Sequence, residues 1–184
     1  MKANHWQTRD RILQLQNPWL TLIGEHLQDP HGTVLEYWRV EKADSVIILP
    51  MQKQRLILPL PTYRPGLGKP TWDFPGGRCP ADQHPEQAAV AILQRELDLP
   101  AAAIARLLPL NQQGWAINSS FSNQRLYGFV ADLKSEAVVP TARIAATYPA
   151  NATGIQALLE MLQCLQCRLV LREWQASQLE ARSS

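Results

Sequence analysis

Two oppositely charged residues, Arg95 and Glu96, stand side by side in an alanine-rich segment that follows the glycine pair Gly76-Gly77. A carboxylate is a ligand for Mg²⁺, whereas a guanidinium repels cations and offers a planar fork of donors to a phosphate. A glycine pair supplies backbone that adopts a positive φ angle without strain. Helices that follow such a turn usually carry several carboxylates that hold a divalent metal, and this helix carries few.

Cys164 and Cys167 form a C-x-x-C pair inside the apolar helical pattern IQALLEMLQCLQCRLVL. Redox or zinc chemistry at such a pair favours a helix N-terminus or a second cysteine pair, and the pattern indicates neither. Cys79 is the third cysteine, and an odd number argues against a disulfide framework. We therefore expect the pair to be two small core residues, one helical turn apart.

Length and composition predict one folded domain over residues 1–184, because 46% of the chain is hydrophobic and only 18% is charged. The net charge is +2, and no block of like charge marks a nucleic-acid or membrane-surface binder. No apolar run approaches the roughly 20 residues that cross a bilayer. The first residues, MKANHWQTRDRILQLQ, lack the apolar core of a signal peptide, so we expect a cytoplasmic protein.

The elements that must position these residues follow from apolar patterns and turn signals. The expected elements are an N-terminal extension at about 1–18, a hairpin at about 20–42, a second hairpin made of SVIILPM and RLILPLP, a strand at about 72–74, a helix from 85 to about 97, a strand at 124–133, a strand within VVPTARIAATYP and a C-terminal helix over about 153–180. Thr153 is the expected cap of the last helix. This order predicts the α/β (α+β) class, with a mixed sheet and helices on its faces.

The segment GGRCPADQHPEQAAVAILQRELDL resembles a Nudix box, whose pattern is G-x5-E-x7-R-E-U-x-E-E-x-G-U with U aliphatic. The preceding stretch, TYRPGLGKPTWDFPGG, resembles the approach to the box in the ADP-ribose pyrophosphatase branch of that family. SSFSNQRLYGFVADL resembles the later loop and strand of the same branch. The resemblance covers residues 20–133 and implies a Nudix fold, in which a mixed sheet is sandwiched between helices and preceded by an antiparallel hairpin.

The box itself, at 75–99, departs from the family pattern at most of its acidic positions. Aligned on Gly77, the first box glutamate falls on Gln83, the Arg-Glu pair on Ala91 and Ile92, the Glu-Glu pair on Arg95 and Glu96, the closing glycine on Asp98, and the branch's later catalytic glutamate on Gln124. Of five acidic positions, only Glu96 keeps its carboxylate. The resemblance thus implies a degenerate Nudix box.

The loss of acids bears on metal binding, because positions 92, 95 and 96 share an arc of about 100° on a helix. Three carboxylates on that arc can bind Mg²⁺ against a pyrophosphate, whereas Ile92 and Arg95 cannot. The resemblance leaves Glu96 and the backbone carbonyl of Gly76 as the metal ligands, enough for at most one substrate-bound Mg²⁺. A missing general base typically lowers the rate by about 10²–10⁴.

The resemblance also implies a set of substrate-binding residues, namely Arg64, Arg95, Gly76, Gly77 and Gln124. Simpler roles remain open for several residues. Glu96 is either a remaining ligand and catalytic acid or an ordinary solvated helix residue. Arg95 either binds a phosphate or pairs with a nearby acid. Arg64 either lies near the substrate or is a surface residue beside a rigid turn, and Asp73 is either a remaining acid of the site or a strand-end cap.

Two functional hypotheses follow. In the first, the protein binds a nucleotide-like ligand or serves as an interaction module, and hydrolyses weakly or not at all. In the second, it is an active Mg²⁺-dependent hydrolase of ADP-ribose-like compounds that uses Glu96 together with acids such as Glu136, Glu160 or those of a second subunit. The resemblance also implies a homodimer in which the N-terminal hairpin reaches across.

Overall fold

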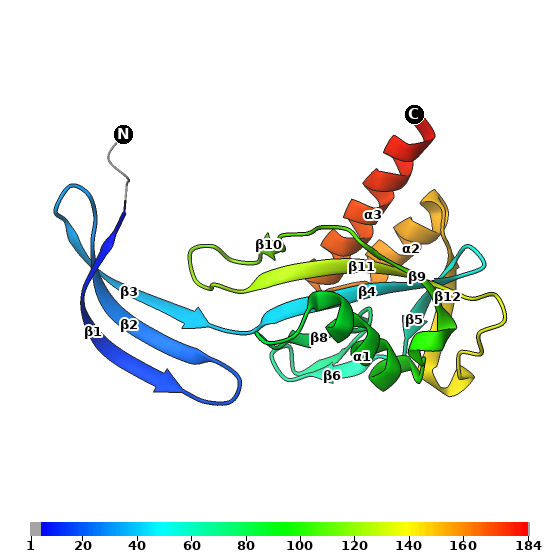
Figure 1. Ribbon diagram of the computed structural model, residues 1–184, viewed down its shortest axis with the longest axis horizontal. Helices are drawn as coiled ribbons and strands as arrows, with labels where there is room; N and C mark the ends of the chain where they lie inside the picture. Colours follow the sequence, from blue (N-terminus) through cyan, green and yellow to red (C-terminus); the bar gives the residue numbers. More distant parts are fainter. Residues whose placement is uncertain (1–4, 184) are drawn as a thin grey trace. The chain divides into compact units, whose positions relative to one another are not determined.

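The computed structural model describes residues 5–183 and divides the chain into two compact units (Figure 1). The N-terminal unit runs to Ala43 and includes Ala116–Arg125. The main unit contains Asp44–Trp115 and the chain from Leu126 onward. The predicted site is divided between them, because Gln124 belongs to the N-terminal unit and the other predicted residues belong to the main unit.

The N-terminal unit is an antiparallel sheet of β1 (Gln7–Gln16), β2 (Thr21–Gln28) and β3 (Val34–Glu41), in the order β1-β2-β3. The predicted hairpin is β2 and β3, which pair from Thr21↔Glu41 to Gln28↔Val34. Asp29 closes its turn by accepting hydrogen bonds from the backbone N–H groups of His31 and Thr33, at 2.8 and 2.9 Å. The N-terminal extension, for which the sequence pattern predicts no element, contributes the third strand, β1.

The main unit is built on a mixed sheet with the order β10-β11-β4-β5-β12, to which β8 adds by pairing with β4 and β9 by pairing with β11. β11 and β4 are parallel, whereas the pairs that β5, β8, β9 and β12 form are antiparallel. Its strands are β4 (Asp44–Gln52), β5 (Arg55–Pro59), β8 (Gly76–Cys79), β9 (Ile104–Pro109), β10 (Trp115–Ala116), β11 (Arg125–Leu133) and β12 (Ile144–Pro149). A separate ribbon joins β6 (Thr62–Arg64) to β7 (Lys69–Thr71).

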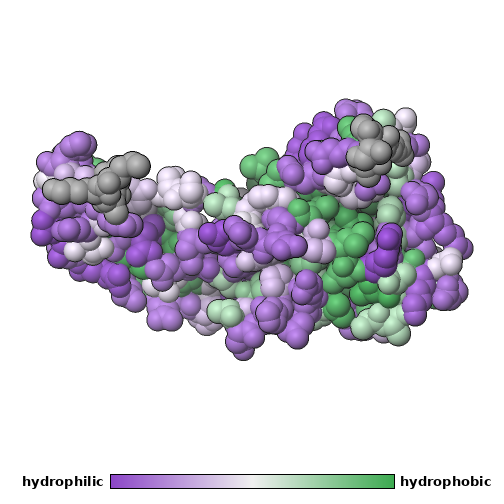
Figure 2. Space-filling view, turned by 45° about the horizontal axis from the view of Figure 1, so that its top comes forward, coloured by the Kyte–Doolittle hydropathy of each residue, from purple (hydrophilic) through white to green (hydrophobic). Residues whose placement is uncertain are grey.

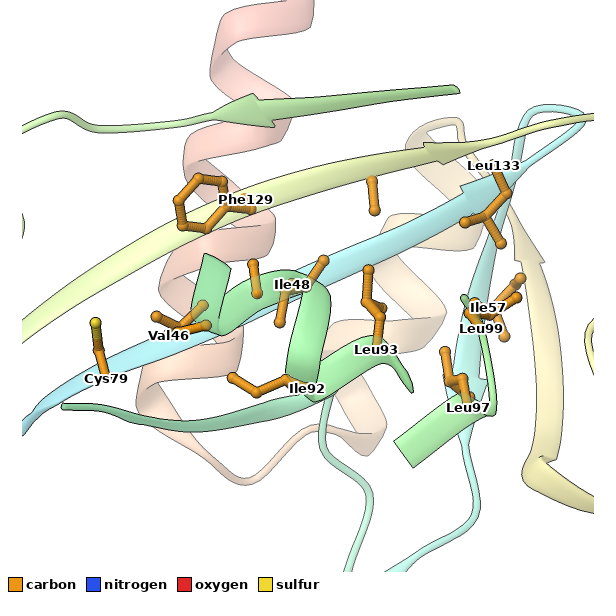
Figure 3. Close-up of a cluster of buried hydrophobic side chains, with 13 residues drawn as sticks. Val46, Ile48, Ile57, Cys79, Ile92, Leu93, Leu97, Leu99, Phe129 and Leu133 are labelled. Atoms are coloured by element: carbon orange, nitrogen blue, oxygen red, sulfur yellow. The ribbon is translucent and has the colours of Figure 1, made fainter. Parts of the chain in front are cut away.

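Helices cover both faces of this sheet (Figure 1). Helix α1 (Pro85–Leu97) lies on one face, and α2 (Ala152–Met161) and α3 (Leu165–Ser183) lie on the other, as the view past α1 in Figure 3 shows. Short 3₁₀ turns occupy Ala101–Ala103 and Thr141–Arg143. None of the helices within the described residues combines the length and apolar character that a membrane span requires.

The core beneath α1 fixes that helix against the sheet. Ile92 and Leu93 of α1 are buried against Val46 and Ile48 of β4 and Phe129 of β11 (Figure 3). Because Val46 and Ile48 are two residues apart on one strand, both point to the α1 face. Figure 2 shows one side of the molecule, where patches of apolar surface on the main unit alternate with hydrophilic regions.

The predicted fold class is confirmed: a mixed sheet lies between helices, and an antiparallel hairpin precedes it. Two local predictions are wrong. Residues 72–74 are not a strand, since β7 ends at Thr71. The single C-terminal helix is two helices, because the backbone leaves helical geometry at residues 162–164, and Asn151 rather than Thr153 caps α2 by accepting a hydrogen bond from the N–H of Gly154.

Candidate functional site

The glycine strand β8 and the last turn of α1 bring the predicted residues together. Strand β8 is held against β4 by the pairs Val46↔Gly77 and Ile47↔Gly76. Pro85 occupies the first turn of α1, where its missing N–H is not needed. The helix ends at Leu97, and its C-cap is Asp98, whose φ of 54° is left-handed and whose N–H donates to the carbonyl of Leu93. The Nudix pattern places a glycine at this position, a residue suited to that conformation.

Gly76 and Gly77 are required for close approach and not for a positive φ, which corrects the expectation from the sequence. The positive-φ glycines of the described chain are Gly32, Gly68 and Gly114. A Cβ at Gly76 would lie 3.1 Å from the carbonyl oxygen of Val46. A Cβ at Gly77 would lie 3.0 Å from Nη2 of Arg95 and 3.2 Å from Cδ1 of Ile92. The absent side chains therefore make room for the neighbouring strand and for the end of the arginine.

The guanidinium of Arg95 joins the two groups that the resemblance assigns to a metal. Its Nη2 donates to the backbone carbonyl of Gly76 at 3.2 Å and to Oε1 of Glu96 at 2.7 Å. Oε2 of Glu96 in turn accepts from the N–H of Gly76 at 3.3 Å. The carboxylate, the carbonyl and the guanidinium thus form a closed cluster, here called the Arg95 cluster, with a positive charge already in place between two oxygen ligands.

The residues of this cluster do not fit a Mg²⁺ ion. Magnesium requires near-octahedral oxygen coordination and loses its water reluctantly. Both candidate oxygens are engaged by a guanidinium, which repels a divalent cation. Ile92, which falls on a glutamate position of the Nudix pattern, is 1% exposed and offers no ligand atom. Within residues 5–183, Glu96 belongs to no group of three or more histidine, cysteine or acidic side chains close enough to hold a metal ion.

The side chain of Arg64, the last residue of β6, is held by a buried carboxylate. Its Nε donates to Oδ2 of Asp73 at 2.6 Å, and the hydroxyl of Thr71 donates to the same oxygen at 2.9 Å. Asp73 is buried, whereas Arg64 is exposed. Asp73 therefore positions Arg64. This role differs from the two that the sequence left open for Asp73, a remaining acid of the site or a strand-end cap. This arrangement fixes one end of a guanidinium that faces solvent.

Gln124 is buried in the N-terminal unit, where its Nε2 donates to the carbonyl of Ala43 at 2.9 Å. The replacement acids considered above have their own local contacts. Glu160 accepts a hydrogen bond from Gln156 on α2, and Glu136 accepts one from the Ser135 hydroxyl at 3.4 Å. These contacts give no support to a role for either acid beside Glu96.

A cavity of about 720 Å³ opens elsewhere on the main unit. Its lining includes Met51, Arg106, Asp132, Ile155 and Trp174, contributed by sheet strands and by α2 and α3. None of the predicted site residues lines it. The Arg95 cluster and this cavity are therefore separate features, and the polar groups expected for phosphate chemistry belong to the cluster.

The Cys164–Cys167 pair lies at a helix N-terminus, contrary to the expectation from the sequence. Helix α3 begins at Leu165, and the N–H of Arg168 donates to the carbonyl of Cys164 at 3.0 Å, the first bond of the helix. Cys164 is thus the residue that precedes the first turn. The sequence carried no signal for this break, because neither glycine nor proline interrupts MLQCLQCRL.

The comparisons with known proteins identify the fold. No family sequence profile matches this chain, and no curated protein is similar to it in sequence. The structure is similar to the crystal structure of an ADP compounds hydrolase, with a TM-score of 0.70 over 97% of this chain and 98% of that chain, at 18% identity. This similarity supports the Nudix fold, and at this identity it establishes the fold alone.

Proposed function

We propose that this is a Nudix-fold protein of the ADP-ribose pyrophosphatase type that binds a nucleotide-like diphosphate and hydrolyses it weakly or not at all. The observation that carries the proposal is the position of Arg95, whose guanidinium binds both Glu96 and the Gly76 carbonyl. The guanidinium of Arg95 thus takes the place of the metal ion that a hydrolase would bind from solution. The similarity to an ADP compounds hydrolase supports the ligand class.

Binding without a metal requires positive charge that is already oriented. Arg95 is 60% exposed, and its contacts with Gly76 and Glu96 are made through Nη2, so the remainder of the guanidinium can meet a phosphate. Arg64 is oriented by Asp73 and supplies a second guanidinium. Guanidinium–phosphate pairs are charge-assisted and directional, which favours a diphosphate over a neutral ligand.

Efficient hydrolysis requires parts that the Arg95 cluster does not provide. A metal ion stabilises the charge that develops on the phosphate and activates the attacking water. Glu96 is the remaining acid, and its carboxylate is held by Arg95 and by the N–H of Gly76. Loss of a general base alone typically costs about 10²–10⁴ in rate. The chemistry of the site therefore favours ligand retention over turnover.

The test measures binding and turnover separately. Thermal shift with ADP-ribose in the presence of a chelator should show stabilisation that Arg95→Ala removes and that Arg172→Ala, an exposed arginine on α3, retains. AMP release with Mg²⁺ or Mn²⁺ should stay near the uncatalysed level. Rapid metal-dependent AMP release that Glu96→Gln abolishes would refute the proposal and support an active hydrolase instead.

We also propose that the protein is a homodimer formed through the N-terminal unit. Leu13, Gly24 and Trp38 are aligned across its three strands, as are Leu15, Leu22 and Val40. The shared face is apolar, yet Leu15 is 52% and Trp38 is 41% exposed. An exposed apolar face on a thin sheet favours burial against a second copy.

The oligomeric state tests this proposal directly. Light scattering should give a dimer for the native chain and a monomer for the double variant Leu13→Asp/Leu15→Asp. Leu67→Asp, which changes an exposed leucine of the main unit, is the matched control and should remain a dimer. A native chain that stays monomeric at high concentration would contradict the assignment.

A further inference from the structure

The C-x-x-C pair combines one accessible thiol with one buried thiol at the start of a long helix. Cys164 is half-buried and immediately precedes the 19-residue helix α3. The N-terminus of a helix carries partial positive charge, which stabilises a thiolate placed there. Cys167 lies one turn further on and is 1% exposed. The two sulfurs therefore differ in access to solvent and in electrostatic environment.

A third group, the carboxylate of Asp73, lies against the pair. The two Sγ atoms and a carboxylate oxygen of Asp73 all lie within 4.8 Å of one another. The Cys167 thiol donates to Oδ1 of Asp73 at 3.9 Å, while Oδ2 accepts from Arg64 and Thr71. The carboxylate is thus fixed beside the buried thiol by two donors on its other oxygen.

The ionisation of the two thiols agrees with this geometry. The one proton of the Cys167 thiol, which Asp73 accepts while Cys164 is neutral, is donated to Cys164 once that residue is a thiolate; this hydrogen bond, aided by backbone N–H groups at the helix start, lowers the pKa of Cys164 to about 6. The same hydrogen bond and burial raise the pKa of Cys167 well above its usual range. The charged groups around the pair are Asp73, its partner Arg64, and Arg168, whose guanidinium binds the carbonyls of Leu159 and Leu162 just before Cys164.

We propose that Cys164 and Cys167 are a redox-active dithiol that forms a reversible intramolecular disulfide by exchange with a small-molecule disulfide such as oxidised glutathione. Cys164 is the attacking thiol, because it is accessible and lies at the helix N-terminus. Cys167 is the resolving thiol, because it is buried one turn away on the same helix. This site shares no residue with the Arg95 cluster, although its Asp73 also holds Arg64, the second guanidinium of the proposed function.

The exchange proceeds in two balanced steps. The Cys164 thiolate attacks one sulfur of glutathione disulfide, so that a Cys164–glutathione bond forms and the first glutathione leaves as a thiolate. The Cys167 thiol then loses its proton to Oδ1 of Asp73 and attacks Sγ of Cys164, which releases the second glutathione as a thiolate. The proton passes from Asp73 to that thiolate. Two cysteines are oxidised and one glutathione disulfide is reduced to two thiols.

Oxidation also changes the surroundings of Arg64. In the reduced protein, Asp73 accepts hydrogen bonds from Cys167 on one oxygen and from Arg64 on the other. The disulfide removes the thiol proton, so Asp73 loses the first of these donors. The redox state of the pair therefore changes the hydrogen bonding of the carboxylate that holds Arg64, the last residue of β6.

The experiment uses the full reduced chain, equilibrated with defined ratios of reduced to oxidised glutathione and then trapped with acid. Mass spectrometry should show loss of two hydrogens per chain, and peptide mapping should place the bond between Cys164 and Cys167, with Cys79 still a thiol. In Cys167→Ser the reaction should stop at one glutathione per chain, on Cys164. Cys164→Ser should prevent both products, whereas Cys79→Ser should leave them unchanged.

Three results would overturn the proposal. The first is a native chain that keeps all three of its cysteines as thiols at every glutathione ratio. The second is faster modification of Cys79 than of Cys164. The third is one tightly bound zinc per purified chain that protects both thiols until a chelator removes it, which would make the pair a metal site. The native-chain mapping needs no variant, so the test holds even if a substitution impairs folding.

Discussion

Replacing Arg95 with glutamine should increase the affinity of the protein for Mg²⁺, because it removes a positive charge from between two oxygen ligands. The guanidinium Nη2 lies 2.7 Å from Glu96 Oε1 and 3.2 Å from the Gly76 carbonyl. Two unit charges about 4 Å apart interact with about 1 kcal/mol in water, and a divalent ion doubles this to about 2 kcal/mol. We use the solvent-screened value because Arg95 is 60% and Glu96 is 32% exposed.

This free energy corresponds to an increase in affinity of about 30-fold, since about 1.4 kcal/mol is a factor of ten. Arg95→Glu should bind Mg²⁺ more tightly still, because it also adds a carboxylate. Isothermal titration with MgCl₂ measures both, and Arg172→Gln is the control for a general change in charge. An Arg95→Gln protein that folds normally and binds Mg²⁺ no better than the native chain would refute the view that Arg95 occupies the cation position.

The remaining predictions concern the core beneath α1 and the thiol pair. Ile92→Glu, which introduces the acid of the Nudix pattern, should lower the free energy of unfolding in urea by at least the roughly 2–5 kcal/mol of a large-to-small core change, because Ile92 is 1% exposed. Ile92→Met is the control and should lower it by less than about 1.5 kcal/mol. A fully stable Ile92→Glu protein would show that this position reaches solvent. Alkylation of Cys164 by iodoacetamide should have its midpoint near pH 6 and slow as the pH falls through that value, because the reactive thiolate becomes protonated. In Cys167→Ala, which removes the donor, a midpoint that stays near pH 6 would contradict the role of the Cys167 thiol as the main cause of the shift.

The sequence predicts those elements whose signals are local. Pro85 and the following apolar spacing predict α1 to within its observed bounds, Pro85–Leu97. The turn residues between β2 and β3 predict the first hairpin. Strand β1 carries only a short signal, the alternation of Leu13 and Leu15 with Gln14 and Gln16, and in the structure all ten residues of QTRDRILQLQ are exposed. It is a strand because it pairs with β2, and this partner is not visible from its own residues.

The candidate site depends more on tertiary contacts. The motif alignment identifies Arg95, Glu96 and Gly76, but it leaves open whether Arg95 binds a phosphate or an acid. The hydrogen bond from Arg95 to the Gly76 carbonyl connects the three groups. This bond depends on the packing of β8 beside α1. The position of Cys164 at the N-terminus of α3 likewise depends on where α2 ends.

A counter-ion that is covalently attached cannot be diluted, exchanged or removed by a chelator. If Arg95 serves ligand binding in place of a metal, occupancy of the protein will follow the concentration of its ligand and will be insensitive to swings in free magnesium. It will also resist substitution by manganese or calcium, which compete at metal-dependent sites. The protein would then report ligand levels under ionic conditions in which a metal-dependent relative would lose its response.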